Sequence, residues 1–186
     1  MRLFIAIEIP DDIKEFLYQL TSLSTSLDGV SIVKKENFHI TLKFLGEVKE
    51  NLILDITNTL KKISNEFSPF ALKISHPGAF PDKFKPRVIW IGTENADNLI
   101  EIVERIENEM EYLGFKKEER KFKSHITLAR VKNYSNGKYL FERVTKRFFQ
   151  NPFKLEFQVK EFVLMKSTLT PSGSIYEILQ RFPLIK

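Results

Sequence analysis

A short repeat constrains the fold of this chain more than any other feature of its sequence. The segment Phe38-His-Ile-Thr-Leu42 is matched by Ser124-His-Ile-Thr-Leu128, which puts the two histidines at positions 39 and 125, or 86 residues apart in a chain of 186. Each copy follows a predicted strand and a predicted long helix. A repeat of this length indicates two diverged α+β halves related by a pseudo-two-fold axis.

Hydrophobic periodicity supports an α+β fold in which each half contains antiparallel sheet and helices. We expect residues 1–186 to form one domain of two similar lobes with a central cleft, because no linker or low-complexity tract divides the chain. Gly114 follows an apolar helical pattern and is expected to end that helix. The expected strands are 2–9, 39–45, 70–75, 87–92, 123–131, 153–166 and 174–179, the expected helices are 11–27, 51–63, 96–113 and 138–149, and the Pro-rich segment 76–86 is an expected loop.

Composition excludes several classes of chemistry. The chain has no cysteine, so it can form neither a disulfide nor a thiolate zinc site, and it has no cysteine nucleophile. It has 29 Lys and Arg against 24 Asp and Glu, a net charge of +5 that is compatible with a polyanionic ligand. No signal peptide and no apolar stretch of membrane-spanning length is evident, so we expect a soluble, cytoplasmic protein.

Side chains alternate between the two faces of a strand, so His39 and Thr41 share one face and His125 and Thr127 share another. The same alternation adds Lys43 to the first face and Lys123 to the second. If the two halves are related by two-fold symmetry, these faces meet and surround a phosphate with imidazole, hydroxyl and ammonium groups. His76, the third histidine, lacks the motif and is expected in a loop or a capping hydrogen bond.

Two imidazoles are suited to phosphodiester hydrolysis without a metal. Histidine titrates near ~6.5, so one ring can be neutral and accept a proton from water while the other is protonated and donates to the leaving oxygen. The threonine hydroxyls can stabilise the charge that develops on the phosphate, a task that metal ions perform elsewhere. We therefore expect neither a metal nor a cofactor.

The two His-x-Thr motifs resemble those of the 2H phosphoesterases, in particular the bacterial and archaeal RNA 2′,3′-cyclic phosphodiesterases once described as 2′-5′ RNA ligases. The resemblance extends to Arg2-Leu-Phe-Ile-Ala-Ile7, Asn37 to Gly46, Pro86 to Gly92, Ser124 to Arg130, and Ser167 to Gly173 with Tyr176. The second motif reads Ser-His where many relatives have Pro-His.

This resemblance implies a two-lobed fold and hydrolysis of RNA 2′,3′-cyclic phosphate to a 2′-phosphomonoester, with His39 as proton donor and His125 as acceptor. It also implies that the enzyme can catalyse the reverse 2′-5′ ligation and that its substrates are RNAs such as tRNA halves or related cyclic nucleotides. We expect the protein to be a monomer. Arg130 recurs in the family, but strict alternation places it opposite His125 unless the strand contains a bulge.

Three alternatives use the same residues differently. The first is a module that binds RNA ends without turnover, and the second is a metallohydrolase with His39, His76 and His125 as ligands, which lacks the usual ligand spacing. The third is a structural protein, which does not explain why a threonine hydroxyl accompanies each histidine. Among the aromatic residues, Phe80 and Phe84 on the Pro-rich segment are candidates for stacking on a base, whereas Trp90 is expected to be packed.

Overall fold

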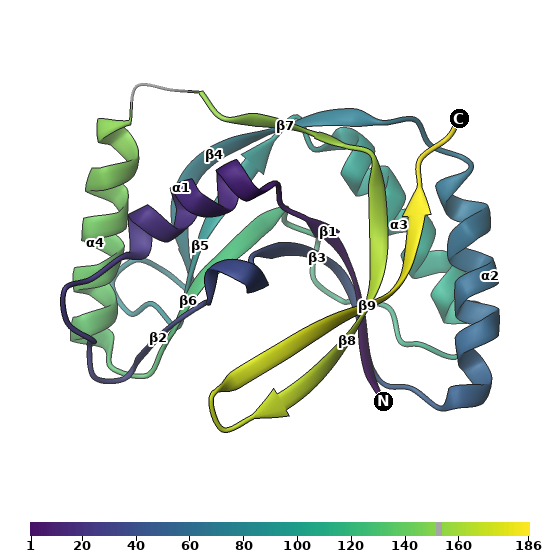
Figure 1. The fold of residues 1–186 in the computed structure, drawn as a ribbon, viewed down its shortest axis with the longest axis horizontal. Coiled ribbons are helices and arrows are strands. Elements are labelled where there is room, and N and C mark those ends of the chain that lie inside the picture. The colour runs from purple at the N-terminus through teal and green to yellow at the C-terminus, as the bar shows by residue number, and fades with distance from the viewer. Residues whose placement is uncertain (152–153) are drawn as a thin grey trace.

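Two antiparallel sheets form the framework of the protein in a computed structural model that describes residues 1–151 and 154–186 (Figure 1). The four-stranded sheet has the order β3-β1-β8-β9, and the five-stranded sheet has the order β2-β6-β5-β4-β7. The strands of the first sheet are β1 (Arg2–Glu8), β3 (His39–Glu47), β8 (Glu161–Thr170) and β9 (Gly173–Pro183). Those of the second are β2 (Val30–Ile32), β4 (Phe70–Phe80), β5 (Val88–Glu94), β6 (His125–Val131) and β7 (Glu156–Val159).

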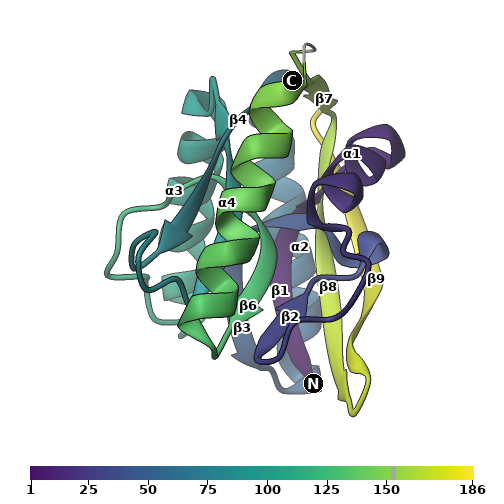
Figure 2. The ribbon, with the colours of Figure 1, turned by 90° about the vertical axis from the view of Figure 1, so that its left-hand side faces the viewer.

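Each sheet is covered by one helix from each half of the chain. Helices α2 (Ile53–Ser64) and α3 (Asp97–Tyr112) contact each other and the four-stranded sheet. Helices α1 (Asp11–Thr21) and α4 (Tyr134–Gln150) contact each other, and α4 lies against the five-stranded sheet (Figure 2). We call each sheet with its two helices a lobe. The halves of the sequence are therefore exchanged between the lobes, an arrangement that the repeat alone did not predict.

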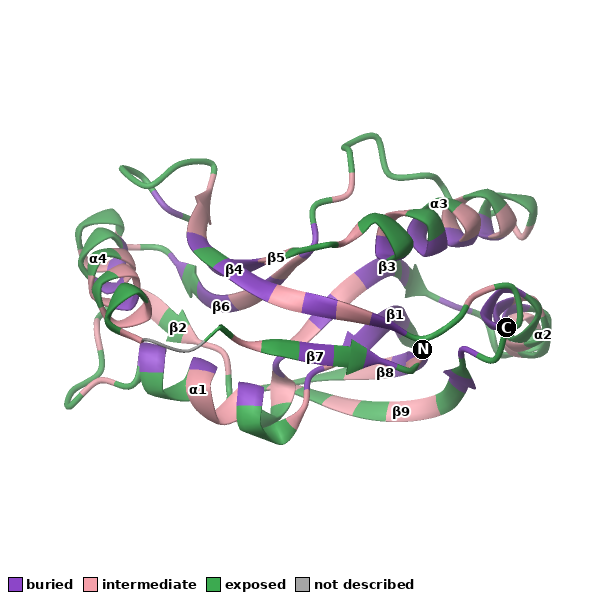
Figure 3. Cartoon of the chain, turned by 90° about the horizontal axis from the view of Figure 1, so that it is seen from above, coloured by how far each residue is buried: buried purple, intermediate pink, exposed green. Residues whose placement is uncertain are grey.

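Buried residues line the strands and the inward faces of the helices, whereas the outer helix faces are exposed (Figure 3). One connected hydrophobic cluster extends through both lobes, and a small second cluster around Phe4, Ala6, Val163 and Met165 lies on the other face of the four-stranded sheet. Two short 3-10 helices, η1 (Lys35–Asn37) and η2 (Glu50–Leu52), precede β3 and α2. Among the described residues, none of the helices combines the length and hydrophobicity that crossing a membrane requires.

The end of α3 confirms the prediction for Gly114. Apolar residues from Leu99 to Met110 are buried on one face of this helix. Gly114 has a positive φ of 90°, and Phe115 N donates to Met110 O over 3.0 Å just beyond it. Glycine adopts this left-handed conformation without the strain that a Cβ introduces, so the helix ends there.

Helix α1 ends earlier than the predicted limit of residue 27. It ends at Thr21, and the chain then continues toward β2, a strand that we did not predict. The guanidinium of Arg147 on α4 donates to the carbonyl oxygens of Gln19, Leu20 and Ser22 at 2.9, 3.1 and 2.6 Å. These carbonyls are unsatisfied at a helix end, so a residue distant in sequence stabilises the end of α1.

Two predictions for the strands were wrong. Residues 76–80 belong to β4 instead of a loop, because a register shift between Ile74 and Pro77 lets the proline enter the strand at an irregularity. The predicted strand 153–166, whose first residue lies outside the described residues, is two strands that separate at Lys160. Strand β7 pairs with β4 in the five-stranded sheet, and β8 pairs with β1 in the other.

Candidate active site

The two His-x-Thr motifs lie on β3 and β6, which contact each other where the two sheets meet. Both strands bulge at the leucine of the motif. Residues 41 and 43 pair with the adjacent residues Ala6 and Ile5, so Leu42 has no partner in the ladder. Residues 127 and 129 likewise pair with Trp90 and Ile89, which leaves Leu128 unpaired. The repeat thus preserves a backbone irregularity as well as four residues.

Each bulge reverses the side-chain alternation beyond it. Position 44 on β3 and position 130 on β6 consequently lie on the same face as the histidine of their strand. Phe44 packs against Phe4, which in turn packs against His39. Arg130 occupies the equivalent position on β6 and is exposed. The bulge that the placement of Arg130 required is therefore present.

Both imidazoles are oriented by the backbone two residues earlier. His39 Nδ1 lies 2.7 Å from Asn37 O, and His125 Nδ1 lies 2.6 Å from Lys123 O. A carbonyl only accepts, so Nδ1 carries a hydrogen in both rings and Nε2 has the lone pair when the ring is neutral. The Nε2 atom of His39 is 2.9 Å from Thr41 Oγ1. In each neutral ring Nε2 is therefore the atom that can accept a proton, and in His39 this atom is bonded to the Thr41 hydroxyl.

Aromatic rings hold each imidazole from the side. Tyr176 on β9 meets the ring of His39 edge-on at 5.3 Å between centroids, and Phe80 on β4 meets His125 edge-on at the same distance. Trp90 lies 6.0 Å from His125 and is 4% exposed, as predicted for a packed residue. Gly78 makes room for it, since a Cβ at this position would lie 2.2 Å from the indole. Sequence reasoning missed Gly78, because its role depends on cross-strand pairing.

Burial lowers the pKa of both histidines below the ordinary value. For His39 the hydrogen bond to Asn37 opposes this effect, while the positive charges of Lys14, His125 and Arg130 add to it. For His125 the hydrogen bond to Lys123 opposes it, while the charges of Lys123 and Arg130 add to it. The charge of Arg130 thus contributes to the lowered pKa of both imidazoles. The free protein favours the neutral form of each imidazole.

Lys123 lies beside His125, with its ammonium 4.3 Å from the centroid of the Trp90 ring and 5.7 Å from that of Phe80. These cation–π contacts hold its charge near the second motif. Lys123 thus lies two residues before β6, and its ammonium is held beside the rings that contact His125.

The prediction that Lys43 faces the same site was wrong. Its side chain is fully buried, its ammonium is 2.6 Å from Glu107 Oε2 on α3, and it donates to Lys116 O over 2.9 Å. The bulge at Leu42 turns residue 43 toward the core of the four-stranded lobe, so strict alternation gave the wrong face. Lys43 is therefore a structural ion-pair residue whose ammonium is bonded to Glu107 and Lys116 in the interior of this lobe.

Two further candidates from the sequence have exposed side chains. His76 lies on β4, which corrects its expected place in a loop. Phe84 lies on the segment after β4 and lines a groove with α4. Among the described residues, no three His, Cys, Asp or Glu side chains are grouped to hold a metal ion.

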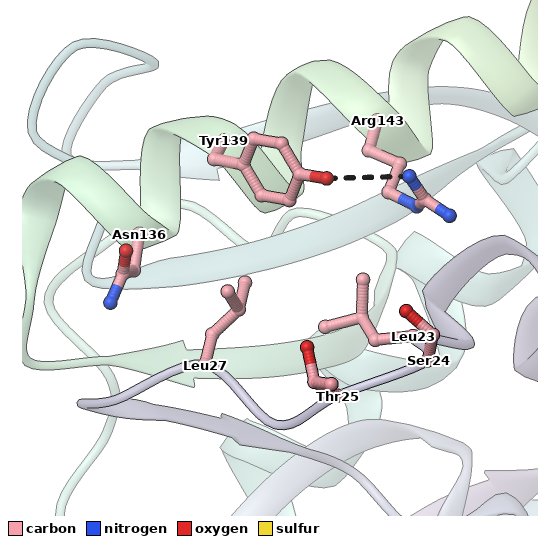
Figure 4. A pocket seen from close by; sticks show the side chains of 7 residues that line it. All are labelled: Leu23, Ser24, Thr25, Leu27, Asn136, Tyr139 and Arg143. Carbon is pink, nitrogen blue, oxygen red and sulfur yellow. Dashed lines mark hydrogen bonds between the residues drawn. The ribbon is translucent and has the colours of Figure 1, made fainter.

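A separate pocket of about 300 Å³ lies between the segment after α1 and helix α4 (Figure 4). The guanidinium of Arg143 donates to the hydroxyl of Tyr139 over 3.3 Å at its wall. Its other lining residues are Leu23, Ser24, Thr25, Leu27 and Asn136. No residue of either motif lines this pocket, so the histidines belong to a different surface.

A His-x-Thr motif thus lies on each of two strands that contact each other, one from each half of the sequence, and comparison with known families agrees with this repeat. The LigT like phosphoesterase family matches the chain twice, over residues 7–90 and 91–176, with one His-x-Thr motif in each match. The chain belongs to this family. The double match also confirms the two repeated halves predicted from the sequence.

Relatives match along nearly the whole chain. An RNA 2′,3′-cyclic phosphodiesterase of Methanocaldococcus jannaschii is 42% identical over 182 residues, which are 98% of this chain and 100% of the relative. One of Archaeoglobus fulgidus is 35% identical over 98% of this chain and 99% of its own length. The crystal structure of the protein TT0787 of Thermus thermophilus superposes with a TM-score of 0.82 at 28% identity and covers 99% of this chain and 98% of that one.

Proposed function

We propose that this protein hydrolyses the 2′,3′-cyclic phosphate at an RNA end to a 2′-phosphomonoester, with His39 and His125 as the acid–base pair. The observation that carries the proposal is the pair of imidazoles on two strands that contact each other across the two sheets, each bonded through Nδ1 so that Nε2 is the atom that can exchange a proton. The names of relatives at 42% and 35% identity support the substrate class.

The reaction needs two proton transfers. His125 Nε2 accepts a proton from water as its oxygen attacks phosphorus, and the bond from phosphorus to the ribose 3′ oxygen breaks. His39 Nε2 donates a proton to that oxygen, which leaves as a hydroxyl. Thr41, Thr127 and Arg130 stabilise the negative charge on the non-bridging oxygens, because donors aimed at developing charge lower the barrier. Lys123 contributes its charge beside His125.

The lowered pKa of His39 in the free protein is reconciled with its role as an acid by the charge of the substrate. A bound phosphodiester carries one negative charge, and a negative charge near an imidazole raises its pKa. His39, which is neutral in the free enzyme, therefore takes up a proton as substrate binds, and the reaction requires His125 to remain neutral as the base.

The same groups support reverse 2′-5′ ligation. If the 5′ hydroxyl of a second RNA replaces water, His125 deprotonates that hydroxyl and His39 protonates the same leaving oxygen, which gives a 2′-5′ phosphodiester. RNA fragments with 2′,3′-cyclic ends, including tRNA halves, and 2′,3′-cyclic nucleotides all present the required phosphate.

The experiment is to incubate the protein with an oligonucleotide that ends in a 2′,3′-cyclic phosphate, in the presence of EDTA, and to identify the product isomer by chromatography against synthetic standards. We expect turnover that EDTA does not reduce and a 2′-phosphate product. Binding without turnover would favour the RNA-end binding module. Loss of turnover in EDTA that only added metal restores would favour the metallohydrolase.

A further inference from the structure

A groove of about 460 Å³ lies on the five-stranded lobe between the segment after β4 and helix α4. Lys83 and Phe84 form one side of it. The other side is a face of α4 at helical spacing, with Lys138, Phe141, Lys146 and Phe149. The buried residues of α4 are Gly137, Leu140 and Val144, none of which lines the groove. Phe141 lies at the edge of the groove and also packs against the core.

Two of the three phenylalanine rings that line it are open to solvent. Phe84 is 66% exposed and Phe149 is 69% exposed, although phenylalanine gains most from burial. Lys83 Nζ lies 5.2 Å from the centroid of the Phe84 ring. Two large exposed rings beside a groove are a surface on which flat apolar groups can stack.

The charge of the groove is positive. Lys83, Lys138 and Lys146 contribute three ammonium groups, against the single carboxylate of Glu142, which lies 4.0 Å from Lys138 Nζ. Exposed aromatic rings combined with a positive groove are the features that bind single-stranded nucleic acid, in which bases stack on rings and phosphates meet cations.

A short segment joins the groove to the candidate active site. Phe80, which contacts His125, is only four residues before Phe84, a span of at most about 14 Å. Asp82 Oδ1 accepts hydrogen bonds from Phe84 N at 2.8 Å and Lys85 N at 2.9 Å, which stabilise the turn over residues 82–85. Pro86 packs at Gly137 of α4, where a Cβ would lie 3.2 Å from the proline ring.

We propose that this groove binds the single-stranded RNA body a few nucleotides upstream of the cyclic phosphate, with bases on Phe84 and Phe149 and phosphates on Lys138 and Lys146. This inference rests on the proposed function, because it assigns the path of the same substrate. It predicts that an oligonucleotide is a better substrate than a cyclic mononucleotide, which is too short to reach the groove.

The test compares a 2′,3′-cyclic mononucleotide with a 2′,3′-cyclic decaribonucleotide in two groove variants, F84A/F149A and K138A/K146A. We expect the KM for the decaribonucleotide to rise about fivefold or more for each ring removed, because one lost base–aromatic stack weakens binding by at least about 1 kcal/mol. The lysine variant is expected to reduce the salt slope of that KM by about 0.7 for each phosphate that is no longer bound. The KM and kcat for the mononucleotide should not change.

Matched controls on the other lobe are K61A/K62A at the end of α2 and Y112A at the end of α3, which remove the same charge and an exposed ring. They should behave as wild type. A fluorescein-labelled decaribonucleotide with a plain 3′ hydroxyl, followed by anisotropy, reports on the groove independently of hydrolysis. Weaker binding in the groove variants alone supports the groove, even if cyclic phosphate is not hydrolysed. Equal binding and equal KM in groove variants, controls and wild type would overturn it.

Discussion

Replacing Lys43 with methionine tests the structural assignment of this residue. Methionine fills similar space but leaves Glu107 unpaired, and breaking a buried ion pair in this way costs about 3–5 kcal/mol. Glu107 keeps 13% of its side chain exposed and accepts a hydrogen bond from Glu118 N at 3.3 Å. Both features reduce the penalty, so we expect a loss at the lower end of that range, about 3 kcal/mol. At about 2–4 °C per kcal/mol for this chain length, the Tm should fall by about 6–12 °C.

The assay is thermal unfolding of Lys43→Met, with Lys62→Met on the exposed side of α2 as a control that should melt near wild type. Replacing Glu107 with leucine in the Lys43→Met background removes the orphaned carboxylate, so we expect it to recover part of the loss. The kcat/KM for a cyclic phosphate, measured well below the Tm, should stay near wild type. An unchanged Tm with a large loss of kcat/KM would show that Lys43 serves the substrate after all.

The remaining predictions concern the two motifs and the residues around them. Thr41→Ala and Thr127→Ala should each reduce kcat about ten- to a thousandfold, because each removes one donor and leaves proton transfer in place; losses as large as those of the histidine variants would contradict this ranking. Burial lowers the pKa of both histidines, so the bell-shaped profile of kcat/KM should have its optimum below about 6.5, and an optimum well above that value would refute it. The unfolded chain then binds more protons than the native protein just below about pH 6.5, so the free energy of unfolding should fall with decreasing pH there, and less so in His39→Gln, as denaturant titrations can measure. Gly78→Val should displace Trp90, shift the emission of this single tryptophan and reduce kcat/KM about ten- to a hundredfold; unchanged emission with unchanged activity would show that the indole is not positioned by Gly78.

The sequence predicted the parts of the fold that depend on local pattern. The periodicity of α3 and the glycine at its end sufficed, because Leu99 to Met110 and Gly114 specify burial and backbone conformation locally. The repeated His-Ile-Thr-Leu segment was enough to predict two similar strands, because its apolar Ile and Leu alternate with its polar His and Thr. Phe80 was likewise a candidate from the Pro-rich segment, and it contacts His125.

What the sequence did not reveal depends on contacts between distant residues. A bulge is a property of two paired strands, so Lys43 was assigned to the wrong face although Ile40 and Leu42 before it are buried as expected. The end of α1 depends on Arg147 of α4. The exchange of the two halves between the lobes depends on packing of α1 against α4 and of α2 against α3, which are distant in sequence. None of these leaves a periodic signal in one segment of the chain.

The division of roles between His39 and His125 is the central claim, and a change of leaving group tests it most directly. His39→Ala and His125→Ala should each lower turnover of an RNA cyclic phosphate about a hundred- to ten-thousandfold while the fold survives. A cyclic phosphate that opens at an activated aryl oxygen needs little protonation on departure. It should therefore rescue His39→Ala far more than His125→Ala. Equal rescue of both variants, or rescue of His125→Ala alone, would contradict the assignment.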